Sequence, residues 1–126
     1  MLKSYLAIFF FCINTILSWA FEGTYDVQGY DPYEKMDYQG SLTIKKDKNG
    51  VYQANWLLKE GKNQYNDIGT GLKINDDTIS FIFKDNQGGS DEGVQIYTRM
   101  DDKTLEGPWV LLSKNLVGKE TLIKRK

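Results

Sequence analysis

From Gly23 onward, apolar and polar residues alternate along much of the chain with a period of two, which is the pattern of strands that bury one face. The apolar positions are rich in Tyr, Val, Ile, Phe and Trp, and Gly, Asn and Asp interrupt them at short intervals. No stretch after residue 20 shows a helical period. We therefore predict strands at residues 23–30, 37–45 and 52–58, in a run ending at 72, and at 79–84, 94–99, 105–112 and 120–124.

The alternation also gathers apolar residues on one face of several runs. These faces consist of Tyr25 and Val27; Tyr38, Leu42 and Ile44; Tyr52, Ala54, Trp56 and Leu58; and Ile79, Phe81 and Phe83. In the run at 94–99 the even-numbered residues oppose the odd-numbered ones, which include Tyr97. The pattern alone leaves open which face of each run points into the barrel.

The connections between these runs are mostly short hairpins. Asn49-Gly50 is typical of a tight turn, because both residues tolerate the positive φ angles that such turns require. No connection has room for a crossover helix, so the runs predict an antiparallel meander. An all-β meander of eight strands removes its exposed edges best by closing into a small barrel, with a β-sandwich as the alternative. Pro108 deletes a backbone donor and predicts an edge strand or a bulge at 105–112.

The N-terminal 20 residues have the features of a cleavable secretory signal peptide. Lys3 precedes an apolar run at 6–17, and Ser18-Trp19-Ala20 places small residues where a signal peptidase requires them. The apolar run is shorter than the roughly 20 residues that a membrane-spanning helix needs, so cleavage is favoured over an uncleaved anchor. We predict a signal peptide at 1–20 and a single β-barrel domain at 21–126, located in the periplasm or secreted and not spanning a membrane.

Composition narrows the functions open to residues 21–126. Cys12 lies in the leader, and the chain has no His, which excludes catalytic triads with an imidazole and the usual zinc ligands. Removal of Lys3 leaves 15 basic and 17 acidic residues, a balance that gives no electrostatic reason to expect nucleic acid or an anionic membrane as partner. We therefore expect a protein that is not an enzyme and needs no disulfide.

The acidic residues that stand side by side fall in predicted turns. Asp76-Asp77, Asp91-Glu92 and Asp101-Asp102 are interpreted as turn residues, because Asp side chains bond the backbone there. The segment from Asp85 to Gly93 has many oxygen ligands but lacks the EF-hand spacing, so it is interpreted as a solvated hairpin. We accordingly expect no metal site and no cofactor.

Aromatic residues are the candidate ligand-binding groups. An eight-stranded barrel is just wide enough to fill with side chains or to hold one small ligand. The side chains best suited to line a cavity with flat faces and a few polar tips are Tyr52, Trp56, Phe81, Phe83, Tyr97 and Trp109. Trp56 and Trp109 both fall within predicted strands, and packing in a filled core is the alternative role for them.

Six spaced elements occur in an order that resembles a family of small secreted bacterial proteins, mostly of unknown function, some of which carry a fibronectin-binding label. The elements are Tyr38-x-Gly40-x-Leu42-x-Ile44, Tyr52-x-x-x-Trp56, Gly69-x-Gly71-Leu72, Gly93-Val94-x-x-Tyr97, Leu105-x-Gly107-x-Trp109 and Gly118-x-Glu120-x-Leu122. The resemblance implies a compact barrel with a lipocalin-like or avidin-like appearance. It brings no catalytic residues.

These observations rank three functional classes. First is a secreted, non-enzymatic binding module for a small apolar ligand in the barrel, or for a macromolecule such as an extracellular protein on its surface. Second is a structural, envelope-associated domain whose barrel is filled with side chains and holds no ligand. An enzyme ranks last, because the residues of 21–126 include neither an imidazole nor a thiol.

Overall fold

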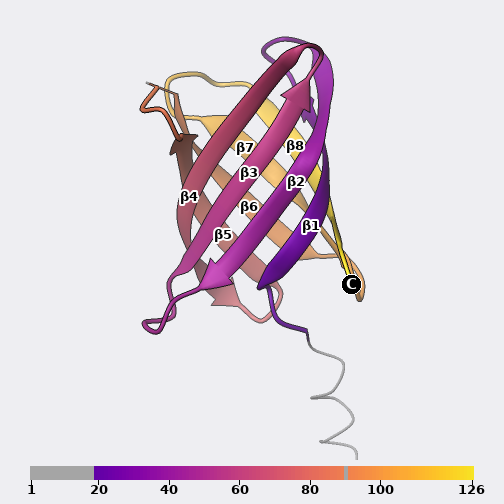
Figure 1. Cartoon of the computed structure of the whole chain (residues 1–126), viewed down its shortest axis with the longest axis vertical. Helices are drawn as coiled ribbons and strands as arrows, with labels where there is room; N and C mark the ends of the chain where they lie inside the picture. Colours follow the sequence, from indigo (N-terminus) through magenta and orange to yellow (C-terminus); the bar gives the residue numbers. More distant parts are fainter. Residues whose placement is uncertain (1–18, 90) are drawn as a thin grey trace, which may run out of the picture.

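The protein is an eight-stranded antiparallel β-barrel in a computed structural model that describes residues 19–89 and 91–126 (Figure 1). The strands are β1 (Gly23–Asp31), β2 (Met36–Lys46), β3 (Tyr52–Glu60), β4 (Asn63–Asn75), β5 (Thr78–Asp85), β6 (Glu92–Arg99), β7 (Thr104–Leu111) and β8 (Val117–Lys124). Each strand pairs with the next, and β1 also pairs with β8. The predicted closed meander is therefore confirmed, and the sandwich alternative is wrong.

The predicted signal peptide lies mostly outside the part of the chain that the structure describes, because residues 1–18 are not described. The assignment of Cys12 to this peptide lies outside the described residues as well. Within the described ranges, no helix has the length and apolar character needed to cross a bilayer.

The inward faces follow the alternation in most strands. Residues that are at most 1% exposed fill the barrel interior, among them Tyr25, Leu42, Ile44, Ile79, Leu105 and Leu122. On β6, Gln95 and Tyr97 are buried and point into the barrel, while Ile96 is exposed. The sequence pattern had left this choice of face open. The interior therefore contains polar groups as well as apolar ones.

Pro108 does not lie on an edge strand, because β7 pairs with both β6 and β8 in the closed barrel. The register between β6 and β7 is the same at Gln95↔Trp109 and at Thr98↔Glu106, so no residue is inserted between them. The prediction of an edge or a bulge is therefore wrong. The amide Nε2 of Gln95 instead donates to the carbonyl oxygens of Gly107 and Pro108, at 3.3 and 3.1 Å, where the ladder is interrupted.

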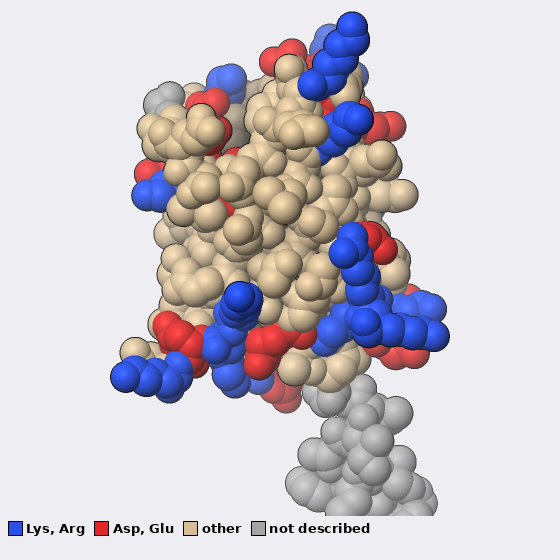
Figure 2. Space-filling view, in the orientation of Figure 1, with Lys and Arg blue, Asp and Glu red and all other residues tan. Residues whose placement is uncertain are grey.

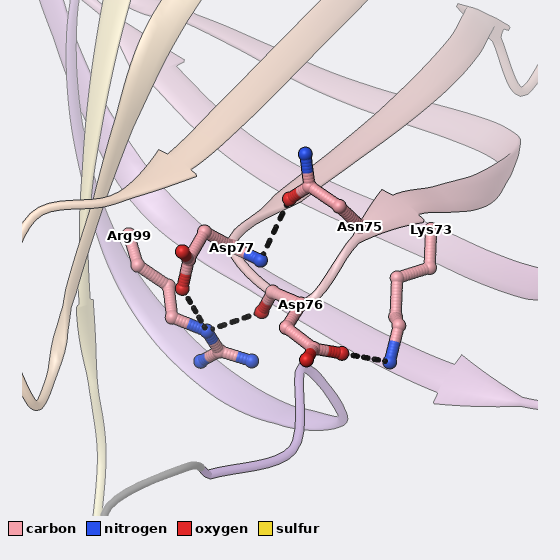
Figure 3. A network of polar contacts seen from close by, with 5 residues as sticks. All are labelled: Lys73, Asn75, Asp76, Asp77 and Arg99. Carbon is pink, nitrogen blue, oxygen red and sulfur yellow. Dashed lines mark hydrogen bonds and ion pairs between the residues drawn. The ribbon is translucent and has the colours of Figure 1, made fainter.

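The end of the barrel that carries the termini is closed by side chains. Phe21 is buried, and the Arg99 guanidinium lies 4.1 Å from the ring centroids of both Trp19 and Phe21. Arg99 Nε also donates to the carbonyl oxygen of Asp76 at 2.8 Å and lies 3.7 Å from the Asp77 carboxylate (Figure 3). Access to the interior is therefore left to the opposite end.

The outer wall of the barrel is apolar in its middle. Leu57, Leu72 and Ile82, on three neighbouring strands, each expose more than half of their side-chain surface. In the face shown by Figure 2, most charged side chains lie towards the two ends of the barrel. This wall is an open surface, whereas the enclosed space lies inside the barrel.

Candidate ligand pocket

A cavity of about 240 Å³ occupies the interior at the end of the barrel opposite the termini. The strand connections at this end are β1–β2, β3–β4, β5–β6 and β7–β8 (Figure 1). Six aromatic side chains line it: Tyr33, Tyr38, Trp56, Tyr65, Phe83 and Trp109. Seven carboxyl groups line it as well: Asp31, Glu34, Glu60, Asp67, Asp85, Asp91 and Glu120. The remaining lining residues are Leu58, Gln95, Leu111 and Lys114.

Glu120 is the most deeply buried of these carboxyl groups and holds several walls in place. It accepts hydrogen bonds from the hydroxyls of Tyr38 and Tyr97 and from Trp56 Nε1, the last at 3.1 Å. Burial raises the pKa of Glu120, although the three donors act in the opposite direction. Because hydrogen bonds are directional, the two bonds from Tyr38 and Trp56 to Glu120 fix the orientation of those side chains at the cavity.

The aromatic wall is continuous from one side of the barrel to the other. The ring of Phe83 lies 5.9 Å from that of Trp56 and 6.4 Å from that of Trp109, both in edge-to-face geometry. Trp109 also contacts Tyr33 and Tyr38 at 5.8 and 6.4 Å. Its indole Nε1 is buried and has no acceptor among the described residues. The wall thus combines flat apolar faces with one unused donor.

Glycines opposite the aromatic residues leave room for the rings against the barrel wall. Gly118 pairs with Trp109, and a Cβ added at Gly118 would lie 2.2 Å from the indole. Gly93 pairs with Phe83, and a Cβ there would lie 2.3 Å from the ring. A side chain at either position would push its ring towards the cavity, so these glycines keep the pocket open.

Two groups of carboxyls are held close together around the pocket. Glu60 is only 4% exposed, and its pKa is raised to about 7 by burial and by the carboxyls of Asp31 and Glu34. Asp67 lies directly opposite Asp85 in the pairing of β4 with β5. Burial first, and then the charges of Asp85 and Glu120, raise the pKa of Asp67 to about 6.

None of the pocket carboxylates has an ion-pair partner among the described residues. The ion pairs in this part of the chain are Lys73–Asp76, Arg99–Asp77, Lys119–Glu106 and Arg125–Asp26. Lys114 is the cation that lines the cavity, and its Nζ lies 5.1 Å from the centroid of the Tyr33 ring. The pocket therefore presents aromatic faces together with uncompensated negative charge.

The six aromatic residues selected from the sequence all lie on inward faces, but at different depths. Trp56, Phe83 and Trp109 line the cavity. Phe81 and Tyr97 are fully buried in the packed core, where Tyr97 bonds Glu120, and Tyr52 packs against Phe21 near the closed end. Half of the selected set thus borders the enclosed space, and the other half supports it.

The carboxyl groups of the pocket were not selected from the sequence. Each of Glu60, Asp67 and Glu120 continues an alternating inward face, as in Trp56-x-Leu58-x-Glu60. Their place in this alternation was the sequence feature that could have identified them as pocket residues. Asp85 and Asp91, interpreted as part of a solvated hairpin, lie at the mouth of the cavity. No three acidic residues in the described ranges stand close enough to hold one metal ion.

The barrel resembles designed β-barrels among the solved structures. A redesigned barrel, mFAP1, bound to DFHBI, has a TM-score of 0.72 and 12% identity, with 82% of this chain and 94% of that chain covered. The barrel EF1p2_mFAP2b, also bound to DFHBI, has a TM-score of 0.71 and 10% identity, with coverages of 88% and 96%. A fluorescence-activating barrel designed de novo has a TM-score of 0.67 and 8% identity, covering 83% and 94%.

At these identities the likeness shows the fold, a small closed barrel of eight antiparallel strands. No protein-family model matches the chain, and no curated protein matches it in sequence.

Proposed function

We propose that this protein is a non-enzymatic binding module that holds one small organic molecule in the pocket at the open end of its barrel. The observation that carries the proposal is the cavity of about 240 Å³ walled by Trp56, Phe83 and Trp109. It has room for roughly eight water molecules at about 30 Å³ each. Protein interiors contain few voids larger than one water molecule, so a barrel that served only as a structural unit has no reason to keep this space.

The designed barrels of the same fold support the proposal, because two of them are bound to a small molecule. The side chains of the pocket also support binding over catalysis. Among the described residues that line it there is no Ser, Thr or Cys nucleophile and no imidazole, and the Glu120 carboxyl is engaged by three donors. The residue pattern at 1–20, which predicts a cleavable signal peptide, supports export as the setting for this function, with the periplasm or the cell exterior as its place.

Native mass spectrometry of freshly purified protein tests the proposal. We expect the folded barrel to carry a small molecule that dissociates on denaturation. Trp109→Ala removes part of the cavity wall, and its spectrum should show the bare chain. Ile82→Ala is the matched control, because Ile82 is 61% exposed on the outer wall and its truncation should leave the bound mass unchanged. A wild-type spectrum that shows only the bare chain would support the filled structural barrel instead.

A further inference from the structure

The charges of this protein are separated in space. The whole chain has 16 basic and 17 acidic residues, yet the pocket is lined by seven carboxyl groups and one lysine. A cleft lined by one sign of charge focuses the electrostatic potential and concentrates counter-ions of the opposite sign. The pocket is therefore selective for the charge of what enters it.

The carboxyl pairs are arranged at a cost to the empty protein. Like charges directly opposite each other on neighbouring strands destabilise a sheet, and Asp67 faces Asp85 in this way. Glu60 is buried at the border of the cavity, and the neighbouring carboxyl of Asp31 contributes to its raised pKa. No cation among the described residues forms an ion pair with either pair. A positive group in the cavity would relieve both repulsions.

The aromatic wall suits the same kind of group. Ammonium and guanidinium groups are attracted to the faces of Trp and Tyr rings within about 6 Å of the centroid. The protein already uses this contact at both ends of the barrel, with Arg99 against Phe21 and Lys114 Nζ 5.1 Å from the centroid of Tyr33. At the closed end Arg99 supplies the cation, whereas Trp56 and Trp109 border open space at the other end.

The geometry points to an organic cation as the ligand: we infer that the pocket binds a protonated amine or quaternary ammonium group attached to a flat apolar body. This inference rests on the proposed binding function. The cationic group lies by Asp67 and Asp85, and the apolar body packs against the wall formed by Phe83 and Trp109. A metal ion fits less well, because no three acidic residues in the described part of the chain converge on one point.

Binding of such a cation depends on pH through the pocket carboxyls. Asp67 faces Asp85 and Glu120, and Glu60 faces Asp31, Glu34 and Tyr65. The pKa values of about 6 for Asp67 and about 7 for Glu60 mean that both groups gain protons as the pH falls from about 8 to about 5. An alkylammonium ligand stays charged over this range. Its affinity should therefore decrease as the pH falls.

The inference is tested with three indoles that differ in one end group: tryptamine, its neutral alcohol tryptophol, and the anion indole-3-acetate. Isothermal titration calorimetry at pH ~7.5 and low salt should show tryptamine binding at least about tenfold more tightly than tryptophol, with indole-3-acetate the weakest. A tenfold ratio corresponds to about 1.4 kcal/mol. The tryptamine affinity should fall at pH ~5, while that of tryptophol stays unchanged.

Asp67→Asn should bring the tryptamine affinity down at least fivefold, towards that of tryptophol, and leave tryptophol binding unaltered. Asp102→Asn is the matched control, since it removes the same charge from an exposed turn between β6 and β7, and it should change neither affinity by more than twofold. Equal binding of the amine and the alcohol, or tighter binding of the anion, overturns the charge inference and leaves the binding function intact. Failure of all three indoles to bind counts against both.

Discussion

Glu60 and Asp67 lower the stability of the folded protein when they are ionised. Their pKa values are raised from 4.5 to about 7 and from 3.8 to about 6, so the folded state holds protons that the unfolded chain has released. The free energy of unfolding therefore decreases as the pH rises through these ranges. The stabilisation that comes from protonated Glu60 and Asp67 is fully present only below the pKa values of the unfolded chain. This is the reverse of the usual behaviour of salt-bridged carboxylates, and it follows from burial beside other acids.

Glu60→Gln should therefore stabilise the protein at pH ~8, on the order of 2 kcal/mol, and have a much smaller effect at pH ~4.5, where Glu60 is protonated in the folded state and about half protonated in the unfolded chain. Urea denaturation at the two pH values measures the difference. Glu92→Gln, at an exposed position, serves as the control and should change stability by less than about 0.5 kcal/mol. Destabilisation of E60Q at the higher pH would mean that the carboxylate has a favourable partner.

At the scale of strands, the pairing of β6 with β7 leaves no room for a side chain at Gly107. Pro108 donates no backbone hydrogen bond, and the Gln95 side chain bonds the carbonyls of Gly107 and Pro108 from inside the barrel. A Cβ added at Gly107 would lie 1.7 Å from the carbonyl oxygen of Ile96, which is backbone and not free to rotate away. The glycine is therefore required by the contact between the two strands.

Gly107→Ala should cost about 1–3 kcal/mol or more, because the two strands must separate to admit the methyl group. For a domain of this size, each kcal/mol lowers the melting temperature by about 4–8 °C. Gly89→Ala is the control, since its Cβ would meet only the flexible Asp85 side chain at 3.3 Å, and it should melt close to the parent. Similar melting temperatures for both variants would show that β7 moves freely against β6.

For the molecule as a whole, the two ends of the barrel have different roles. The end with the termini is closed by Phe21 and by Arg99, which is held by the turn between β4 and β5 (Figure 3). The other end carries the cavity and its acidic mouth. The Arg99 guanidinium contacts the rings of both Trp19 and Phe21. Trp19 belongs to the predicted leader, whereas Phe21 remains after cleavage at the predicted site.

We predict that the exported protein begins at Phe21 and that it keeps the fold without Trp19. Its intact mass should correspond to residues 21–126. It should melt several degrees below a chain that begins at Trp19, because Trp19 is partly buried and forms cation–π contacts with Arg99 and Lys124, each of which contributes about 0.5–1 kcal/mol. A membrane-embedded species that retains residues 1–20 would contradict the predicted processing.

Much of the barrel could be predicted because its determinants are local. Alternation such as Tyr52-x-Ala54-x-Trp56 fixes which side chains share a face, and a turn such as Asn49-Gly50 fixes where the chain reverses. Short connections then leave only neighbouring antiparallel strands, and closure removes the edges. The start of β8 at Val117 was missed, since Gly118 becomes part of a strand only through its pairing with Trp109.

The sequence by itself determined the eight strands, their order and which side chains share a face, because period-two alternation and turn chemistry act between near neighbours. Only the tertiary structure decided which face of each strand points into the barrel, that of β6 included, and where the site lies. Asp31, Glu60 and Glu120 stand far apart in the chain and border one cavity only when β1 closes on β8. The electrostatic character of the pocket arises from distances across the barrel, and the linear spacing of acidic residues does not encode those distances.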